Sequence, residues 1–154
     1  MLSIRSATAS DVAVLSTMIH EMARYERLPL SMTQEQLASD GFGPKPQFRV
    51  ILAEWDGEPA GYAFFFNSYS TFRGRGLFLE DLYVRSEFRR RKIGDALLAQ
   101  VAKVALLENC FGLMLNVLEW NRPAIEFFRR HGVKFLDDWK TGSLEGQAFR
   151  ALAT

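Results

Sequence analysis

Four consecutive cationic residues could bind an anion just before a predicted helix; they are Arg89, Arg90, Arg91 and Lys92. They separate an apolar segment that ends at Val84 from an amphipathic segment that begins at Ile93. The first turn of a helix already carries partial positive charge from unpaired N–H groups, so each added cation costs about 0.3–1 kcal/mol unless something negative compensates it. A phosphate or pyrophosphate would use both the N–H groups and the side-chain charges. A solvated run of charge is the alternative interpretation.

Two carboxylates, Glu80 and Asp81, interrupt the otherwise apolar residues 77–84, which are predicted to form a strand. Side chains alternate along a strand, so we expect these two to point to opposite faces, and only one can face a given cleft. A partly desolvated carboxylate has a raised pKa and is suited to taking up a proton. The alternative is an ion-paired carboxylate at the edge of a strand.

The N-terminal third is predicted to contain a strand, two helices and a loop. A short strand over residues 2–5 precedes a helix that starts with the capping-box pair Thr8 and Asp11 and ends near residues 24–28. Pro29 cannot continue that helix. A second short helix is predicted over residues 33–39, and a loop over residues 40–46.

The middle of the chain is predicted to position the charged residues at one edge of a sheet. Strands are expected over residues 48–55, 59–69 and 76–84, the first two joined by a hairpin turn at Asp56-Gly57. A helix over 93–109 and a strand over 112–118 follow. This order predicts a right-handed crossover between parallel neighbours, with the cationic loop at their carboxyl ends, where ligands often bind.

The C-terminal part is predicted to add a helix and further strands. Asn121 can cap the helix, with Pro123 in its first turn and Gly132 at its end. Residues 134–153 are expected to add one or two strands. The elements together predict an α/β (α+β) chain with a mixed, mostly antiparallel sheet, a central parallel strand pair and flanking helices.

Composition limits the class of protein. A chain of 154 residues predicts a single domain over residues 1–154, and 48% hydrophobic residues exclude a disordered chain. A formal net charge of +1 gives no global attraction to nucleic acid or an acidic membrane, so we expect neither as a partner. The single cysteine, Cys110, the lack of an apolar run of about 18 residues and the lack of a signal segment predict a cytoplasmic protein.

Several motifs occur together from about Thr8 to Trp139. Arg89 and Gly94 match the two ends of an arginine, x, x, glycine, x, glycine loop, with Lys92 at the position of the middle glycine. The other motifs are Tyr25-Glu26, Asp40-Gly41-Phe42-Gly43, Leu79-Glu80-Asp81 and Glu119-Trp120-Asn121, with Pro123, Ile125, Phe127, Arg130 and Gly132. The chain thereby resembles the GNAT-superfamily N-acetyltransferases, and within them the diamine (spermidine/spermine) acetyltransferase branch.

The resemblance implies a GNAT fold, acetyl-CoA as donor, a primary amine of a small cationic acceptor such as a polyamine or a thialysine-like amine, a homodimer and no metal. It assigns Glu80 to the acceptor amine as the catalytic carboxylate. The implied acetyl-CoA positions are Leu82, Tyr83, Val84, Arg89, Arg90, Arg91, Lys92, Ile93, Gly94, Asp95, Asn121, Arg122, Pro123, Ala124 and Phe128. The implied acceptor positions are Tyr25, Glu26, Glu80, Asp81, Met114, Leu115, Asn116 and Asp137.

One position departs from the diamine branch in a way that affects the chemistry. Phe128 stands where that branch has a tyrosine that protonates the departing thiolate. A thiol pKa near 8.5 makes the thiolate a tolerable leaving group, so the loss should slow the reaction without abolishing it, with water or Tyr83 as substitute. A non-catalytic acetyl-CoA or CoA sensor is the alternative function.

Overall fold

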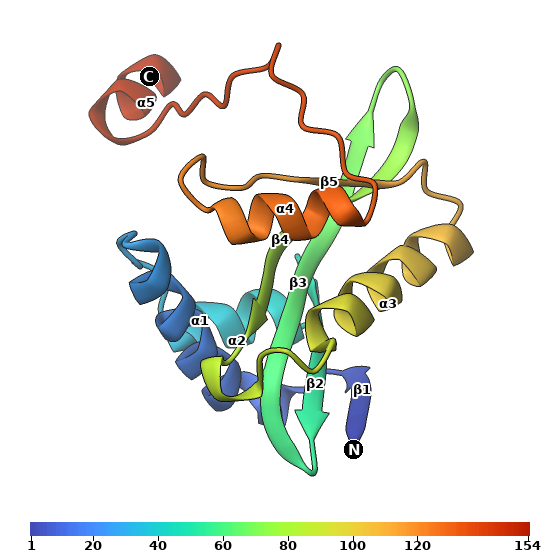
Figure 1. Cartoon of the computed structure of the whole chain (residues 1–154). Coiled ribbons are helices and arrows are strands. Elements are labelled where there is room, and N and C mark those ends of the chain that lie inside the picture. The colour runs from blue at the N-terminus through green and yellow to red at the C-terminus, as the bar shows by residue number, and fades with distance from the viewer. The chain divides into compact units, whose positions relative to one another are not determined.

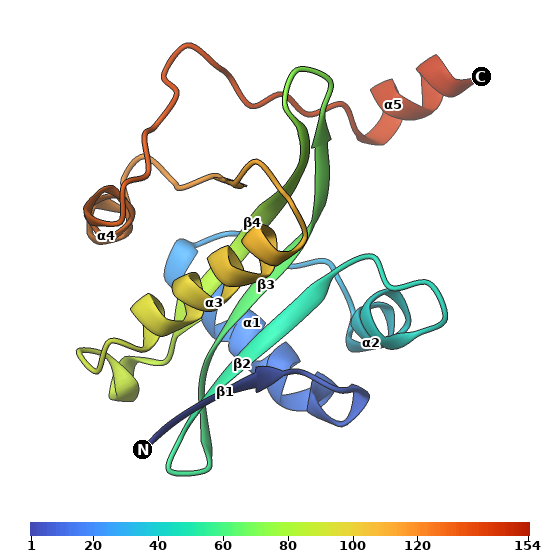
Figure 2. The ribbon, with the colours of Figure 1, turned by 90° about the vertical axis from the view of Figure 1, so that its right-hand side faces the viewer.

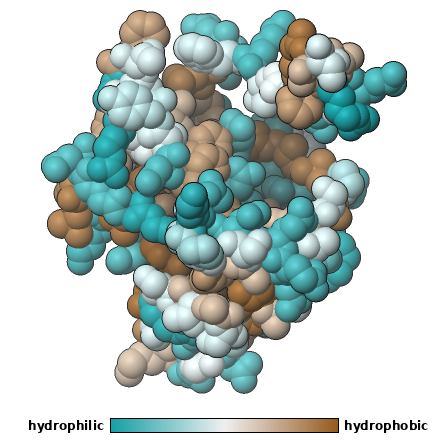
Figure 3. All heavy atoms as spheres, turned by 180° about the vertical axis from the view of Figure 1, so that it is seen from behind, coloured by the Kyte–Doolittle hydropathy of each residue, from teal (hydrophilic) through white to brown (hydrophobic).

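The computed structural model describes residues 1–154, which divide into two compact units, Met1–Asn116 and Val117–Thr154. Each unit is described by itself. A single domain over the whole chain stays a prediction. None of the helices combines the length and the apolar character that a membrane span requires. The face drawn in Figure 3 mixes hydrophilic and hydrophobic residues.

The first unit is built on a five-stranded sheet in the order β1-β2-β3-β4-β5 (Figure 1). The strands are β1 (Leu2–Ser6), β2 (Arg49–Trp55), β3 (Glu58–Ser70), β4 (Gly74–Val84) and β5 (Leu113–Leu115). The first four pair antiparallel and β4 pairs parallel with β5. The predicted mixed, mostly antiparallel sheet is confirmed. The parallel pair lies at the edge of this sheet, not at its centre, because the chain after β5 adds no strand.

Helices cover both faces of this sheet: α1 (Val12–Glu26) and α2 (Gln34–Phe42) lie on one face, and α3 (Ile93–Leu107) lies on the other (Figures 1 and 2). Side chains alternate between the two faces of the sheet along β2 and β3, so each face has its own set of buried residues. Val50, Leu52 and Tyr62 are buried together with Leu15 and Met18 of α1. The intervening strand residues are also buried, so both sheet faces are apolar.

Local sequence signals account for the starts of the helices. The capping box at Thr8 and Asp11 is confirmed, and it opens a 3₁₀ turn that leads into α1. A second capping box joins Thr33 to Gln36 at the start of α2. Such boxes satisfy N–H groups that have no partner within the helix.

The predicted loop over residues 40–46 is wrong in its first three residues, which continue α2 to Phe42. Gly41 was part of that loop prediction, yet it is buried against the ring of Phe48. A Cβ at Gly41 would come within 2.2 Å of Cζ of Phe48, so something would have to shift. Glycine here permits close packing of a helix on the sheet instead of a turn.

The second unit contains α4 (Arg122–Arg130) and α5 (Gly146–Ala153). The predicted cap of α4 is confirmed, because the Asn121 side chain accepts a hydrogen bond from the backbone N–H of Ala124 at 3.4 Å. Gly132 follows the end of α4 with a φ of 93°, a conformation that favours glycine.

The prediction of one or two strands over residues 134–153 is wrong. Residues 131–145 form neither helix nor strand, and α5 occupies most of the rest. A strand needs a neighbouring strand to satisfy its backbone N–H and C=O groups, whereas a helix satisfies most of its own. Three alanines and a leucine in α5 also favour a helix.

Candidate active site

The two predicted carboxylates of β4 lie at a break in the pairing of β4 with β3. Phe64 lies opposite Asp81 and Phe65 lies opposite Leu79, which leaves Glu80 as an extra residue in β4. A β-bulge of this kind interrupts the alternation of side chains. The prediction that Glu80 and Asp81 point to opposite faces assumed a regular strand, and the bulge removes that basis.

A third carboxylate, Glu26 at the end of α1, belongs to the same cluster. Burial, and then the negative charge of Glu80, raise the pKa of Glu26. The negative charges of Glu80 and Glu26 add to the effect of burial and raise the pKa of Asp81. We call Glu26, Glu80 and Asp81 the carboxylate cluster. Its members repel one another, and this repulsion weakens when a cation binds among them.

Asp81 is the most perturbed member of the carboxylate cluster. Burial raises the pKa of its carboxyl to about 7, against the opposing effect of a hydrogen bond from Tyr62. The hydroxyl of Tyr62 donates to Oδ2 of Asp81 at 2.9 Å. Glu80, in contrast, is exposed. Tyr62 was missed in the sequence, where its only signal was a polar hydroxyl within an apolar strand.

Tyr83 lies two residues beyond Asp81 and is held by a charged pair that the sequence did not reveal. Its hydroxyl donates to Oε1 of Glu21 at 3.1 Å, and Arg85 binds both oxygens of the same carboxylate at 3.1 and 3.2 Å. Burial and the negative charge of Glu21 raise the pKa of Tyr83 to about 12. Tyr83 is therefore poorly suited to donate a proton to a leaving thiolate.

The cationic loop lies between the end of β4 and the first turn of α3. Its four side chains, Arg89, Arg90, Arg91 and Lys92, are exposed. The guanidinium of Arg89 lies 5.5 Å from the centre of the Tyr25 ring, and its Nε donates to the carbonyl of Val84 at 3.2 Å. The loop and the end of α1 are thus neighbours.

Two residues of the cationic loop have left-handed backbone conformations. Arg90 has a φ of 63° and Lys92 a φ of 58°. Turns in which left-handed residues alternate with others direct successive N–H groups toward one point. Lys92 precedes α3 as its cap residue but supplies no side-chain acceptor to the first N–H groups. The first turn that follows contains Ile93, Gly94 and Asp95.

β4 continues beyond its parallel neighbour. The register between the two strands joins Leu77–Leu79 to Leu113–Leu115 and ends there. β4 therefore extends past its pairing with β5, and Leu82, Tyr83 and Val84 lie beyond Leu79, its last paired residue. On β5, Met114 is 37% exposed and lies beside Phe78 in register, and Leu115 is half-buried. Asn116, the residue after β5, is exposed.

The remaining predicted residues belong to the second unit. Asn121 is buried and caps α4, and Arg122, Pro123 and Ala124 form the first turn of that helix. Phe128 is buried, and its ring packs edge-on against Phe127 with the ring centres 5.2 Å apart. Asp137 is exposed in the segment between the helices.

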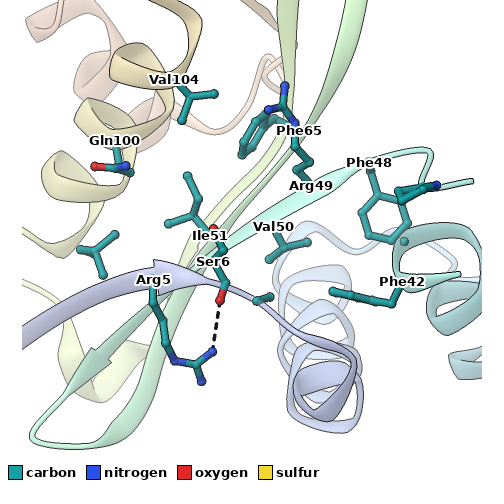
Figure 4. Close-up of a pocket in the computed structure, with 14 residues that line it drawn as sticks. Arg5, Ser6, Phe42, Phe48, Arg49, Val50, Ile51, Phe65, Gln100 and Val104 are labelled. Atoms are coloured by element: carbon teal, nitrogen blue, oxygen red, sulfur yellow. Dashed lines mark hydrogen bonds between the residues drawn. The ribbon is translucent and has the colours of Figure 1, made fainter. Parts of the chain in front are cut away.

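A cavity of about 400 Å³ opens elsewhere in the first unit, where β2 extends beyond the end of β1 (Figure 4). Its walls come from β1, β2, β3, α2 and α3 and from residues next to them, and none of the predicted site residues lines it. Arg5 and Arg49 lie at its rim, and each already binds a carboxylate, that of Asp11 at 2.8 Å and that of Glu108 at 2.6 Å. The carboxylate cluster is not part of this cavity.

Comparison with known proteins agrees with the fold and the motifs. The acetyltransferase (GNAT) family model matches residues 15–133. A thialysine N-epsilon-acetyltransferase of Bos taurus is 37% identical over 163 residues, which cover 97% of this chain and 96% of that protein. A human spermidine/spermine N(1)-acetyltransferase-like protein 1 is 28% identical over 138 residues, 84% of this chain and 20% of that protein. The crystal structure of a possible acetyltransferase from Clostridium difficile 630 superposes with a TM-score of 0.82 at 19% identity, covering 95% and 98% of the two chains.

The chain belongs to the GNAT acetyltransferase family. The predicted resemblance, the GNAT fold and an acetyltransferase enzyme are confirmed by the family match and by the thialysine N-epsilon-acetyltransferase relative. The roles of individual site residues stay predictions.

Proposed function

We propose that this protein transfers the acetyl group of acetyl-CoA to a primary amine of a small cationic acceptor, a polyamine or a thialysine-like amine. The carboxylate cluster is the observation that carries this proposal. The pKa values of Glu26 and Asp81 are raised because negative charges are partly buried near one another. A cationic acceptor would relieve that repulsion. The relatives named for thialysine and for spermidine/spermine support the same substrate class.

The reaction requires removal of a proton before the amine attacks. An alkyl ammonium has a pKa near 10.4, like lysine, and only the neutral amine has a lone pair for the thioester carbon. The carbon–nitrogen bond forms, the carbon–sulfur bond breaks, and the coenzyme leaves as a thiolate that takes a proton. Glu80 is the predicted residue at the acceptor amine, together with Tyr25 and Glu26 on α1.

The cationic loop fits the pyrophosphate of acetyl-CoA. Four exposed cationic side chains, those of Arg89, Arg90, Arg91 and Lys92, precede the first N–H groups of α3, which have no side-chain cap from Lys92. An anion at the first turn of α3 would use both the charges and the N–H groups, and Gly94 and Asp95 would contribute backbone there. The backbone of Leu82, Tyr83 and Val84, past the end of β5, would pair with the pantetheine arm.

The second unit contains the remaining residues that we propose for acetyl-CoA, and the proton donor for the thiolate is still to be assigned. The first turn of α4, from Asn121 to Ala124, is the proposed second acetyl-CoA segment. Phe128 offers no proton, and the hydroxyl of Tyr83 is bound to Glu21. We therefore assign protonation of the thiolate to water. A homodimer in the cytoplasm, with no nucleic-acid or membrane partner, completes the proposal.

Thiol release with a panel of amines tests this function. We expect release with diamines or thialysine-like amines and a drop of about tenfold or more in kcat/KM for E80Q, with calorimetric binding of acetyl-CoA unchanged. E58Q is the matched control, because Glu58 is an exposed carboxylate at the start of β3, far along the sheet from the cluster. Binding of acetyl-CoA without release of the coenzyme's thiol in the presence of any amine would favour the non-catalytic sensor, an alternative that rests on Phe128.

A further inference from the structure

Arg85, the residue directly after β4, joins three elements of the first unit. Its Nε and Nη2 donate to the two carboxylate oxygens of Glu21 on α1, at 3.1 and 3.2 Å, and its Nη1 donates to the carbonyl of Pro59 on β3 at 3.2 Å. All three guanidinium nitrogens are therefore hydrogen-bonded. A planar guanidinium bound in this way fixes direction as well as distance, so the chain leaves β4 along a defined path.

The carboxylate of Glu21 is fully used by the end of β4. Its Oε1 also accepts the hydroxyl of Tyr83 at 3.1 Å, so it receives three hydrogen bonds from two residues of that segment. The side chains of Arg85 and Glu21 are only 18% and 25% exposed. An ion pair that is partly shielded from water is stronger than one on the open surface, so this pair ties β4 firmly to α1.

The pair lies next to backbone groups of β4 that have no neighbouring strand. The N–H of Arg85 donates to the carbonyl of Ala60 on β3 at 2.8 Å. Successive backbone groups of a strand point to opposite sides, so those of Val84 point away from β3. The carbonyl of Val84 accepts Nε of Arg89 at 3.2 Å, and β5 pairs with β4 only as far as Leu79. Arg85 thus fixes the residue beside the backbone groups that we propose for the pantetheine arm.

The same pair fixes the start of the segment that leads to the cationic loop. The carbonyl of Arg85 accepts the N–H of Phe88 at 2.9 Å, which closes the short 3₁₀ turn Ser86–Phe88. Arg89 follows that turn directly. Because only one turn separates Arg85 from the loop, a change in the direction of Arg85 is carried into the loop.

We propose that Arg85 and Glu21 are positioning residues for acetyl-CoA. They hold the open side of β4 and the start of the cationic loop in the arrangement that the coenzyme requires, and they act through the backbone without touching the coenzyme. The inference rests on the proposed function. A site whose parts are already held in place binds its ligand with a smaller ordering cost.

E21Q separates positioning from simple electrostatics, because the two effects have opposite signs. Removing a negative charge from this region would by itself strengthen the binding of an anionic coenzyme. Loosening the end of β4 weakens it. We expect the Kd for acetyl-CoA, measured by calorimetry, to rise about threefold in E21Q and about tenfold in R85M. Equal or tighter binding in E21Q overturns the proposal.

R85K tests whether the charge at position 85 is enough. The single ammonium of lysine cannot reproduce the planar contacts to both oxygens of Glu21 and to the carbonyl of Pro59. We therefore expect R85K to bind acetyl-CoA nearly as weakly as R85M. Wild-type binding in R85K overturns the proposal, and this conservative variant decides the matter if R85M or E21Q fails to fold.

R49M is the matched control, because Arg49 forms the other bidentate pair of the sheet. It binds both oxygens of Glu108 at 2.6 and 3.0 Å, and it begins β2, whereas the contact of Arg85 with Pro59 lies near the end of β2. We expect R49M to lose stability in chemical denaturation, as R85M does, with an unchanged Kd for acetyl-CoA. An equal rise of the Kd in R49M would assign the effect to lost stability and overturn the proposal.

Hydrogen exchange of the ligand-free protein gives a readout that does not depend on the coenzyme. The backbone N–H groups of residues 86–92 should exchange faster in E21Q and R85M than in wild type, and not in R49M. Unchanged exchange in E21Q and R85M overturns the proposal. Failure of the proposed function is distinguishable, because the wild-type protein would then not bind acetyl-CoA at all, whereas wild-type binding with an unchanged Kd in the variants removes only the positioning role.

Discussion

Replacing Lys92 by glycine should stabilise the protein while weakening its hold on the coenzyme. Lys92 has a φ of 58° at the residue before α3. The left-handed conformation costs a residue with a Cβ about 1–2 kcal/mol, and glycine loses about 0.5–1 kcal/mol more entropy on folding. The difference favours glycine over a residue with a Cβ at this position by about 0.5–1 kcal/mol, or about 1–4 °C in Tm for a chain of this size.

K92A is the matched control, because it removes the charge but keeps the Cβ. Both variants lose a cation near the positive end of α3, which stabilises each of them by up to about 1 kcal/mol. The difference in unfolding free energy between K92G and K92A therefore isolates the cost of the backbone conformation. Chemical denaturation measures it, and equal stability of K92G and K92A would refute the argument.

Calorimetry with acetyl-CoA measures the other half of this prediction. Removal of one exposed cation beside a phosphate should weaken binding about two- to fivefold in both variants, and less at high salt because exposed charges are screened. Binding unchanged in both variants, at low and at high salt, would place the pyrophosphate away from Lys92.

Three further predictions concern positions outside the cationic loop. F128Y should raise kcat at least about tenfold, measured by thiol release, since it restores a proton donor; no gain with acetyl-CoA binding intact would argue against a missing acid. G61A should destabilise the protein by about 1–3 kcal/mol in chemical denaturation, because its Cβ would come within 2.3 Å of the carbonyl oxygen of Tyr83; a stability equal to wild type would show that the strands can separate freely. Asp11, whose pKa is lowered to about 2 chiefly by its hydrogen bond from Arg5, contributes stability above its unfolded pKa near 4 that is lost as the pH falls toward 2. Acid unfolding of D11N should therefore show a smaller loss of stability between pH 4 and 2 than wild type does.

Features that depend on neighbours in the sequence were predictable. The caps at Thr8 and Asn121, the hairpin turn at Asp56-Gly57 and the cationic run before α3 each depend on a few adjacent residues. Apolar spacing predicted the start of α3 at Ile93 for the same reason. The location of the predicted site also follows from these elements, because the cationic loop comes after β4 in the chain and so lies at the end of that strand.

Features that depend on distant residues were missed or wrong. Gly41 was predicted to be a loop residue because the ring that requires a glycine there belongs to Phe48, which lies just before β2 and is not a close neighbour in the sequence. The tail over residues 134–153 was expected to pair as strands, but backbone pairing requires a partner that no local pattern specifies.

The sequence by itself determined that a cationic turn and two adjacent carboxylates bracket one end of a strand, because residue order along a chain is enough for that. Only the tertiary structure decided how the carboxylates differ. The bulge opposite Phe64 sets the register, and Tyr62, nineteen positions away from Asp81, supplies the hydroxyl that holds it. Burial raises the pKa of Asp81 to about 7 and Tyr62 holds its carboxylate, whereas Glu80 is exposed, and these differences are properties of packing.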